Sequence, residues 1–82
     1  MNNPPPAILT LGDQTLASGR AHVETNSRSA TFWPTDGRHL DTPYPQAMLT
    51  VEGMSEPIPV VDVHQCPASL IHWEMKLADQ PS

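Results

Sequence analysis

Residues 58–77 alternate between apolar and polar or reactive side chains with a period of two. One set comprises Val61, Val63, Ile71, Trp73, Met75 and Leu77. The intervening set comprises Asp62, His64, Cys66, His72, Glu74 and Lys76. Strict alternation is what a β-strand with one buried face requires. The pattern therefore predicts a β-hairpin that turns at residues 67–68 and carries its first set in a dry interior.

The rest of the chain reads as four more short strands, at residues 7–11, 15–25, 29–33 and 47–52. Ten prolines among 82 residues argue against long helices, because proline interrupts helical hydrogen bonding. Small inner residues at Ala17, Gly19 and Ala21 indicate a tightly curved second strand. We expect one all-β domain, a small six-stranded antiparallel barrel without a long helix, because closure removes exposed strand edges. The barrel is expected to span residues 7–77, between a disordered proline-rich leader (1–6) and a polar tail (78–82).

The charge balance excludes one class of partner. A net charge of −5 repels phosphate backbones, so we expect no binding to DNA or RNA. The single cysteine, Cys66, cannot form an intrachain disulfide, and the first residues lack the pattern of a signal peptide. We therefore expect a cytoplasmic protein that does not insert into membranes. An acidic, mildly apolar barrel with open strand edges could also form a homodimer.

The polar face of the hairpin holds three side chains that can bind a metal, His64, His72 and Cys66. If Val63 pairs with Trp73, the same register sets His64 opposite His72, with Cβ atoms about 4.5–5.5 Å apart. These three residues could bind Zn²⁺. Two acidic residues expected to oppose each other could add ligands: Asp62 and Glu74. Alternatively, the face is polar simply because it is wet, or the histidines form a pH-responsive contact surface.

Enzymatic activity is not expected. The sequence contains no Gly-x-Ser-x-Gly elbow and no glycine-rich phosphate loop. Cys66 and His64 are two positions apart, about 6.5–7 Å along a strand, which exceeds hydrogen-bond reach between a nucleophile and its base. We expect a non-enzymatic protein without a cofactor, and Cys66 as a small, partly buried apolar side chain.

An aromatic and proline-rich segment is the main candidate for partner binding. We expect Phe32 to point inward with Ala30, and Trp33 to be covered by a long loop over residues 35–46. Aromatic side chains beside prolines can form a platform for a protein partner. The residues assigned to this platform are Trp33, Asp36, Arg38 and Tyr44.

The order of elements resembles a PilZ domain over about residues 7–77. The resemblance lies in a turn with Gly12-Asp13, a strand with Ser18-Gly19-Arg20-Ala21, a polar turn, and an Ala-Thr-Phe strand. PilZ domains are small six-stranded bacterial barrels, many of which bind cyclic di-GMP. The family motif Asp/Asn-x-Ser-x-x-Gly corresponds to residues 25–30, where Ser27 agrees outright. The Arg-x-x-x-Arg motif has no counterpart in the leader.

The resemblance implies a signalling role through protein partners and not through the nucleotide. The arginine pairs of that family bind phosphates and guanine edges through planar guanidinium groups that donate two hydrogen bonds at once. Few other side chains can replace them in this role. Arg20, Ser27 and Arg28 are the residues that could compensate in part, but we expect no binding of cyclic di-GMP. The leading hypothesis is a non-enzymatic regulatory module that resembles a degenerate PilZ domain. The alternatives are a small metal-binding domain and a cyclic di-GMP receptor.

Overall fold

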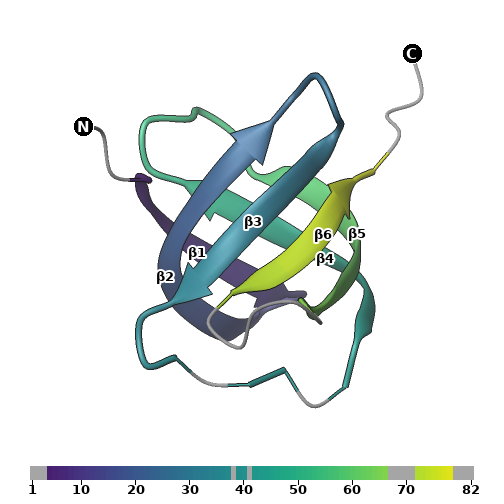
Figure 1. Ribbon diagram of the computed structural model, residues 1–82. Coiled ribbons are helices and arrows are strands. Elements are labelled where there is room, and N and C mark those ends of the chain that lie inside the picture. Colours follow the sequence, from purple (N-terminus) through teal and green to yellow (C-terminus); the bar gives the residue numbers. More distant parts are fainter. Residues whose placement is uncertain (1–3, 38, 41, 67–71, 79–82) are drawn as a thin grey trace.

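The chain forms a closed barrel of six antiparallel strands (Figure 1). The computed structural model describes residues 4–37, 39–40, 42–66 and 72–78. The strands are β1 (Pro6–Leu11), β2 (Gln14–Glu24), β3 (Ser29–Pro34), β4 (Tyr44–Val51), β5 (Ile58–Gln65) and β6 (Trp73–Leu77). Their order around the barrel is β1-β2-β3-β6-β5-β4. The predicted all-β, six-stranded antiparallel barrel is confirmed.

Two long-range strand pairs close the barrel. β3 pairs with β6, and β1 pairs with β4, so each strand has a neighbour on both sides. The described residues of the connection between β3 and β4 (35–37, 39–40 and 42–43) lie beyond one end of the barrel (Figure 1). Within the described residues each strand has two neighbours, although the first residues of β4 pair with β5 alone. The homodimer stays a prediction. That part also contains no helix long and apolar enough to cross a lipid bilayer.

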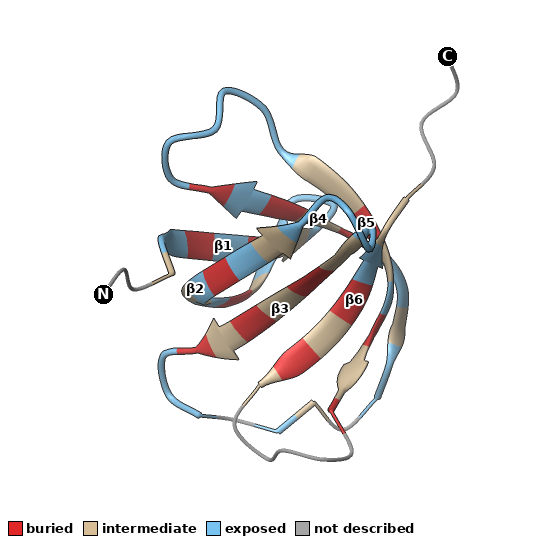
Figure 2. Ribbon diagram, turned by 45° about the horizontal axis from the view of Figure 1, so that its top comes forward, coloured by how far each residue is buried: buried red, intermediate tan, exposed pale blue. Residues whose placement is uncertain are grey.

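Buried residues alternate with more exposed ones along the strands, as the red bands in Figure 2 show. The side chains of the buried residues form one core inside the barrel. The largest fully buried side chains are Trp73, Phe32, Leu9, Leu49, Met75, Val60 and Val63. Phe32 and Trp73 lie on paired strands, with ring centroids 5.5 Å apart and planes tilted by 35°. Such aromatic pairs contribute about 0.5–1.5 kcal/mol beyond the burial of their area. The inward positions predicted for Phe32, Ala30, Trp73 and Met75 are confirmed.

The small residues of β2 allow β3 to approach closely. Ala17 and Ala21 are buried, and Gly19 pairs with Pro34. A Cβ atom on Gly19 would lie 2.0 Å from the backbone oxygen of Trp33. Only glycine fits at this contact, which agrees with the tight curvature predicted for this strand.

β5 departs from the predicted alternation. Val60 and Val63, three positions apart, are both buried, whereas Val61 is half-buried and Asp62 is exposed. Asp62 has a φ of 54°, in the left-handed region, and the pairing of β5 with β6 shifts between Val61 and His64. An extra residue in one strand defines a β-bulge, which reverses the alternation beyond it. The prediction that Val61 lies in the interior is therefore wrong.

The bulge also changes the partners across the hairpin. The observed pairs are Val60 with Leu77, Val61 with Lys76, His64 with Glu74, and Gln65 with Trp73. The predicted register, with Val63 opposite Trp73 and His64 opposite His72, is wrong. It differs from the observed register by one residue at Val61 and, because of the bulge, by two residues at His64. The predicted turn at 67–68 and Ile71 lie outside the described residues.

The boundaries of two predicted segments also differ. β4 begins at Tyr44, so residues 44–46 belong to a strand and not to the long loop. β1 begins at Pro6, and the Pro5 carbonyl accepts a hydrogen bond of 3.1 Å from the Ala21 backbone. Within the connection, Leu40 packs against the core, and its N–H donates to the Gln65 side chain at 3.1 Å. The end of β5 is thereby tied to the β3–β4 connection.

Candidate functional site

The end of the β5–β6 hairpin gathers three metal-ligating side chains of different chemistry. One ligand atom from each of Cys66, His72 and Glu74 lies within 4.8 Å of the other two. Antiparallel pairing produces this cluster, because the Cys66 N–H donates to the His72 carbonyl at 3.3 Å. Cys66 is 5% exposed, whereas His72 and Glu74 are half-buried. A thiol, an imidazole and a carboxylate therefore share a site at the edge of the interior.

His64 lies beside this cluster but does not oppose His72 as predicted. Its Nε2 lies 3.7 Å from Oε1 of Glu74. Its Nδ1 lies 2.6 Å from the Asp62 carbonyl oxygen. Of the predicted ligand set, the structure thus brings Cys66 and His72 together, and the third member of the cluster is Glu74 and not His64. Asp62 is exposed at the bulge and does not oppose Glu74.

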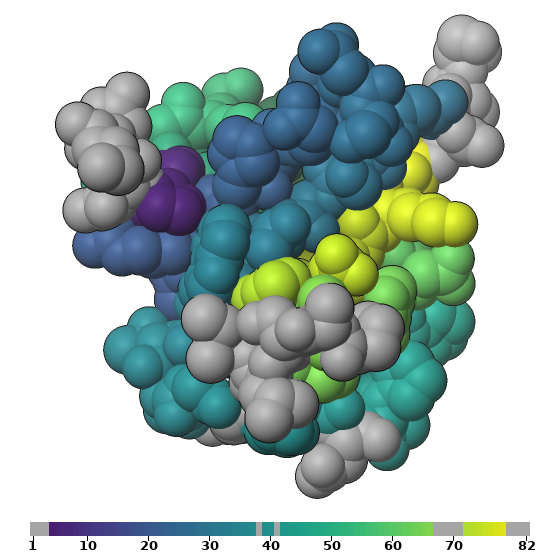
Figure 3. Space-filling view, viewed as in Figure 1, coloured from purple at the N-terminus to yellow at the C-terminus, as the bar shows by residue number. Residues whose placement is uncertain are grey.

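A shallow groove of about 430 Å³ lies beside the hairpin. It is lined by Pro43, Tyr44, Pro45, Asp62, His64 and Lys76. A second hollow of about 180 Å³ shares His64 and Lys76 with it and extends over β3 to Ser29 and Thr31. Figure 3 shows β6 (yellow) and β5 (bright green) side by side on this surface. Tyr44, predicted as a partner-binding residue, therefore lies in a concave surface with both apolar and charged walls.

The other predicted partner-binding residues do not join Tyr44 in this groove. Trp33 is half-buried, and its ring lies against His72 with centroids 6.0 Å apart. Asp36 is exposed and lines a different hollow, with Ala17, Ser18 and Thr35. Arg38 lies outside the described residues. The described residues of the predicted platform, Trp33, Asp36 and Tyr44, thus lie at three different places on the barrel.

The predicted nucleotide-contacting residues are also separated. The Arg20 guanidinium donates to the Pro4 carbonyl at 2.7 Å, on the middle of β2. Arg28, with a φ of 55°, and Ser27 lie in the turn beyond β2. A strand rise of about 3.3 Å per residue puts the end of β2, at Glu24, about 13 Å from Arg20. One small ligand group cannot contact Arg20 and this turn together.

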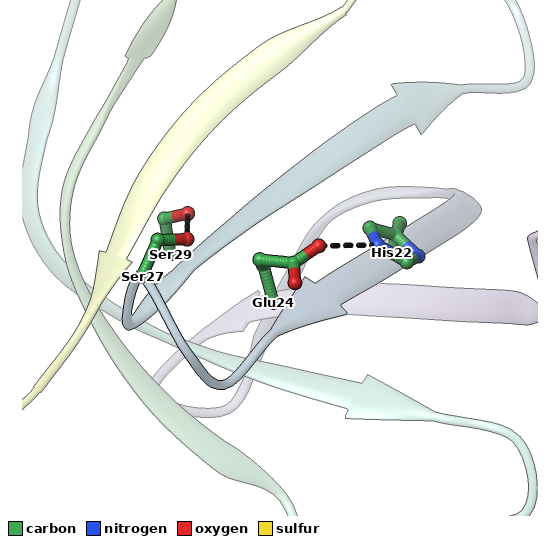
Figure 4. A network of polar contacts seen from close by, with 4 residues as sticks. All are labelled: His22, Glu24, Ser27 and Ser29. Atoms are coloured by element: carbon green, nitrogen blue, oxygen red, sulfur yellow. Dashed lines mark hydrogen bonds and ion pairs between the residues drawn. The ribbon is translucent and has the colours of Figure 1, made fainter.

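Side chains near that turn have partners of their own. Figure 4 shows the Ser27 hydroxyl 2.8 Å from the Ser29 hydroxyl, and Nε2 of His22 3.0 Å from Oε2 of Glu24. The His22–Glu24 pair is exposed on β2. These contacts hold the turn and the end of β2 through local pairing between neighbouring side chains.

Sequence reasoning named Glu74 only as an additional ligand and did not identify Pro43 and Pro45 as parts of a groove. The signal that could have placed Glu74 is Asp62, since aspartate tolerates the left-handed conformation better than most residues and so marks bulges and turns. The bulge at Asp62 accounts for one of the two residues by which the predicted register differs from the observed one at Cys66, which lies opposite His72. No family model, curated protein or solved structure matches this chain. The likeness to PilZ domains therefore depends on the six-stranded antiparallel barrel and on the residues quoted above.

Proposed function

We propose that this chain is a non-enzymatic binding module that recognises an extended segment of a partner protein. The observation that carries the proposal is the groove formed by Pro43, Tyr44 and Pro45 opposite His64 and Lys76. Prolines restrict the backbone on one wall, so the groove loses little conformational entropy on binding. Tyrosine offers a large apolar surface with a polar end, a combination common in protein interfaces.

The charges of the groove favour a peptide over a nucleotide. Lys76 is its one residue with a permanent positive charge, and Asp62 supplies a negative charge beside it. Phosphate groups are bound by several cationic or bidentate donors, and a carboxylate in the same groove repels them. An extended peptide presents polar backbone groups together with apolar side chains. It can therefore contact both the charged and the apolar residues that line this groove. Residues 1–13 contain no arginine, so this stretch offers no pair of bidentate donors for a phosphate.

The test uses a library of random peptides displayed on phage, selected against the immobilised protein. Peptides from the selection are synthesised, and their affinities are measured by calorimetry for the wild type and for variants. We expect Tyr44→Ala to weaken binding by about 30-fold, since central aromatic residues of interfaces contribute about 2 kcal/mol or more. Lys76→Ala, at an exposed position in the same groove, should also weaken binding.

Met54→Ala is the matched control, because Met54 is an exposed apolar side chain 48% accessible to solvent outside this groove. Its peptide affinity should equal that of the wild type. Far-ultraviolet circular dichroism verifies that each variant is folded, which matters for Tyr44 because its side chain also packs on the core. Failure to select any peptide, or peptides that bind Tyr44→Ala and Lys76→Ala as tightly as the wild type, would refute the proposal. Cyclic di-GMP should give no binding heat.

A further inference from the structure

We propose that Cys66, His72 and Glu74 form a binding site for a zinc ion. The three ligand atoms already lie within 4.8 Å of one another. In a tetrahedral zinc site, bond lengths of about 2.0–2.3 Å place neighbouring ligand atoms about 3.3–3.6 Å apart. The ligand atoms would therefore need to approach by about 1 Å, which side-chain rotation of the half-buried His72 and Glu74 can supply.

The backbone fixes the relative positions of the ligands. Cys66 and His72 lie on opposite arms of the hairpin, joined by the hydrogen bond between the Cys66 N–H and the His72 carbonyl. The Gln65 side-chain amide donates to the same carbonyl at 3.1 Å. Glu74 follows His72 by two positions on the same arm, so both side chains point to the same face. The hydrogen bond between Cys66 and His72, directly beyond the ends of β5 and β6, thus holds these two ligands beside Glu74 of β6.

His64 lies beside the three ligands, and a main-chain contact fixes the orientation of its ring. A carbonyl oxygen only accepts hydrogen bonds, so the 2.6 Å contact with Asp62 requires the hydrogen to be on Nδ1 of His64. The other ring nitrogen, Nε2, lies 3.7 Å from a Glu74 carboxylate oxygen, so His64 borders the three ligands. A backbone carbonyl on the far nitrogen is also the usual support for a metal-binding histidine.

The ligand types select the metal. A thiolate is a soft ligand, which favours zinc over magnesium or calcium, and imidazole and carboxylate both suit zinc. Binding would displace the Cys66 thiol proton into solvent, because the thiolate is the ligand form. His64 is a positioning residue, because it lies beside the Glu74 carboxylate and would orient it toward the metal. Loss of His64 should therefore weaken zinc binding less than loss of His72, which is a ligand.

The experiment titrates the reduced, metal-free protein with Co²⁺, a spectroscopic substitute for zinc, and then displaces it with Zn²⁺. We expect one Co²⁺ per chain, a near-ultraviolet thiolate-to-cobalt charge-transfer band, and loss of that band as Zn²⁺ is added. Cys66→Ala should abolish the band. His72→Gln, which keeps the thiol, should weaken Zn²⁺ binding by more than about 100-fold, because loss even of outer partners costs about 10- to 100-fold.

His22→Gln is the matched control, since His22 also pairs with a glutamate, Glu24, but is exposed on β2. Its zinc affinity should be that of the wild type, and circular dichroism should show that every variant is folded. The proposal is overturned if saturating Co²⁺ gives no thiolate band. It is equally overturned if His72→Gln binds Zn²⁺ as tightly as the wild type, or if His22→Gln weakens binding as much as His72→Gln does. Peptide selection through the Tyr44 groove is an independent measurement, so either proposal can fail alone.

Discussion

Gly19 provides the sharpest test of how the barrel is packed. An alanine Cβ at this position would lie 2.0 Å from the Trp33 backbone oxygen and 2.9 Å from the Pro34 Cα. Real Cβ contacts are not shorter than 3.0 Å, so β2 and β3 would have to separate by about 1 Å. The atom in the way belongs to the main chain, so a change of rotamer cannot relieve the contact.

The expected loss follows from two contributions. Overpacking of this kind costs about 1–3 kcal/mol. Separation of the strands also weakens the neighbouring hydrogen bond from the Thr35 N–H to the Ser18 carbonyl, 2.9 Å long, which is worth about 0.5–1.5 kcal/mol. We expect Gly19→Ala to lower the free energy of unfolding by about 3 kcal/mol. That is a large part of the roughly 4–12 kcal/mol typical of a domain of this length.

Urea-induced unfolding, followed by the emission of the two tryptophans, measures this change. Gly12→Ala is the control: Gly12 has a φ of 61°, and a Cβ there would meet nothing within 4 Å. Its cost is backbone strain alone, about 1–2 kcal/mol, reduced by the lower entropy of the unfolded chain. If Gly19→Ala is no less stable than Gly12→Ala, then β3 can shift freely and the close approach does not constrain the barrel.

Three further outcomes are expected. Asp62 has a φ of 54°, so Asp62→Val should lower the free energy of unfolding by about 1–2 kcal/mol, whereas Asp62→Gly should not lower it. Equal thermal stability of the two variants would contradict the bulge. Phe32→Ala should lower the free energy of unfolding by about 3–5 kcal/mol in urea titrations, and a loss below 1 kcal/mol would be inconsistent with its complete burial. The Cys66 thiol, 5% exposed, should react with a chromogenic disulfide reagent far faster in urea than in the native state, and equal rates would contradict its burial.

The class of fold could be predicted because alternation is a local property of the sequence. Trp73 and Met75, or Ala30 and Phe32, fall on one face of any strand that contains them, whatever its neighbours. The start of β4 could not be predicted in this way, because Pro43 and Pro45 resemble loop residues. Pro45 is tolerated because β4 pairs with β1 only from Met48 onward, so the first residues of β4 have β5 as their sole partner in the described structure.

The candidate site could be predicted only in its composition. The hairpin face supplied the right kinds of ligand, but which of them meet depends on the register of two strands. Val60, Val61 and Val63 are equally apolar, so hydrophobic pattern alone cannot decide which two are buried. The pairing of Cys66 with His72 is a consequence of that decision and is not encoded by the spacing of the two residues.

The bulge at Asp62 connects the core to the candidate site. If the pairing of Val61 with Lys76 continued without interruption, His64 would lie opposite Trp73 and share its interior side. A histidine would then occupy the position in which Trp73 requires an apolar neighbour. The extra residue moves His64 opposite Glu74, on the outer face, and turns Val63 into the core. The same local distortion therefore keeps the interior apolar and sets the register in which Cys66 meets His72 and His64 meets Glu74.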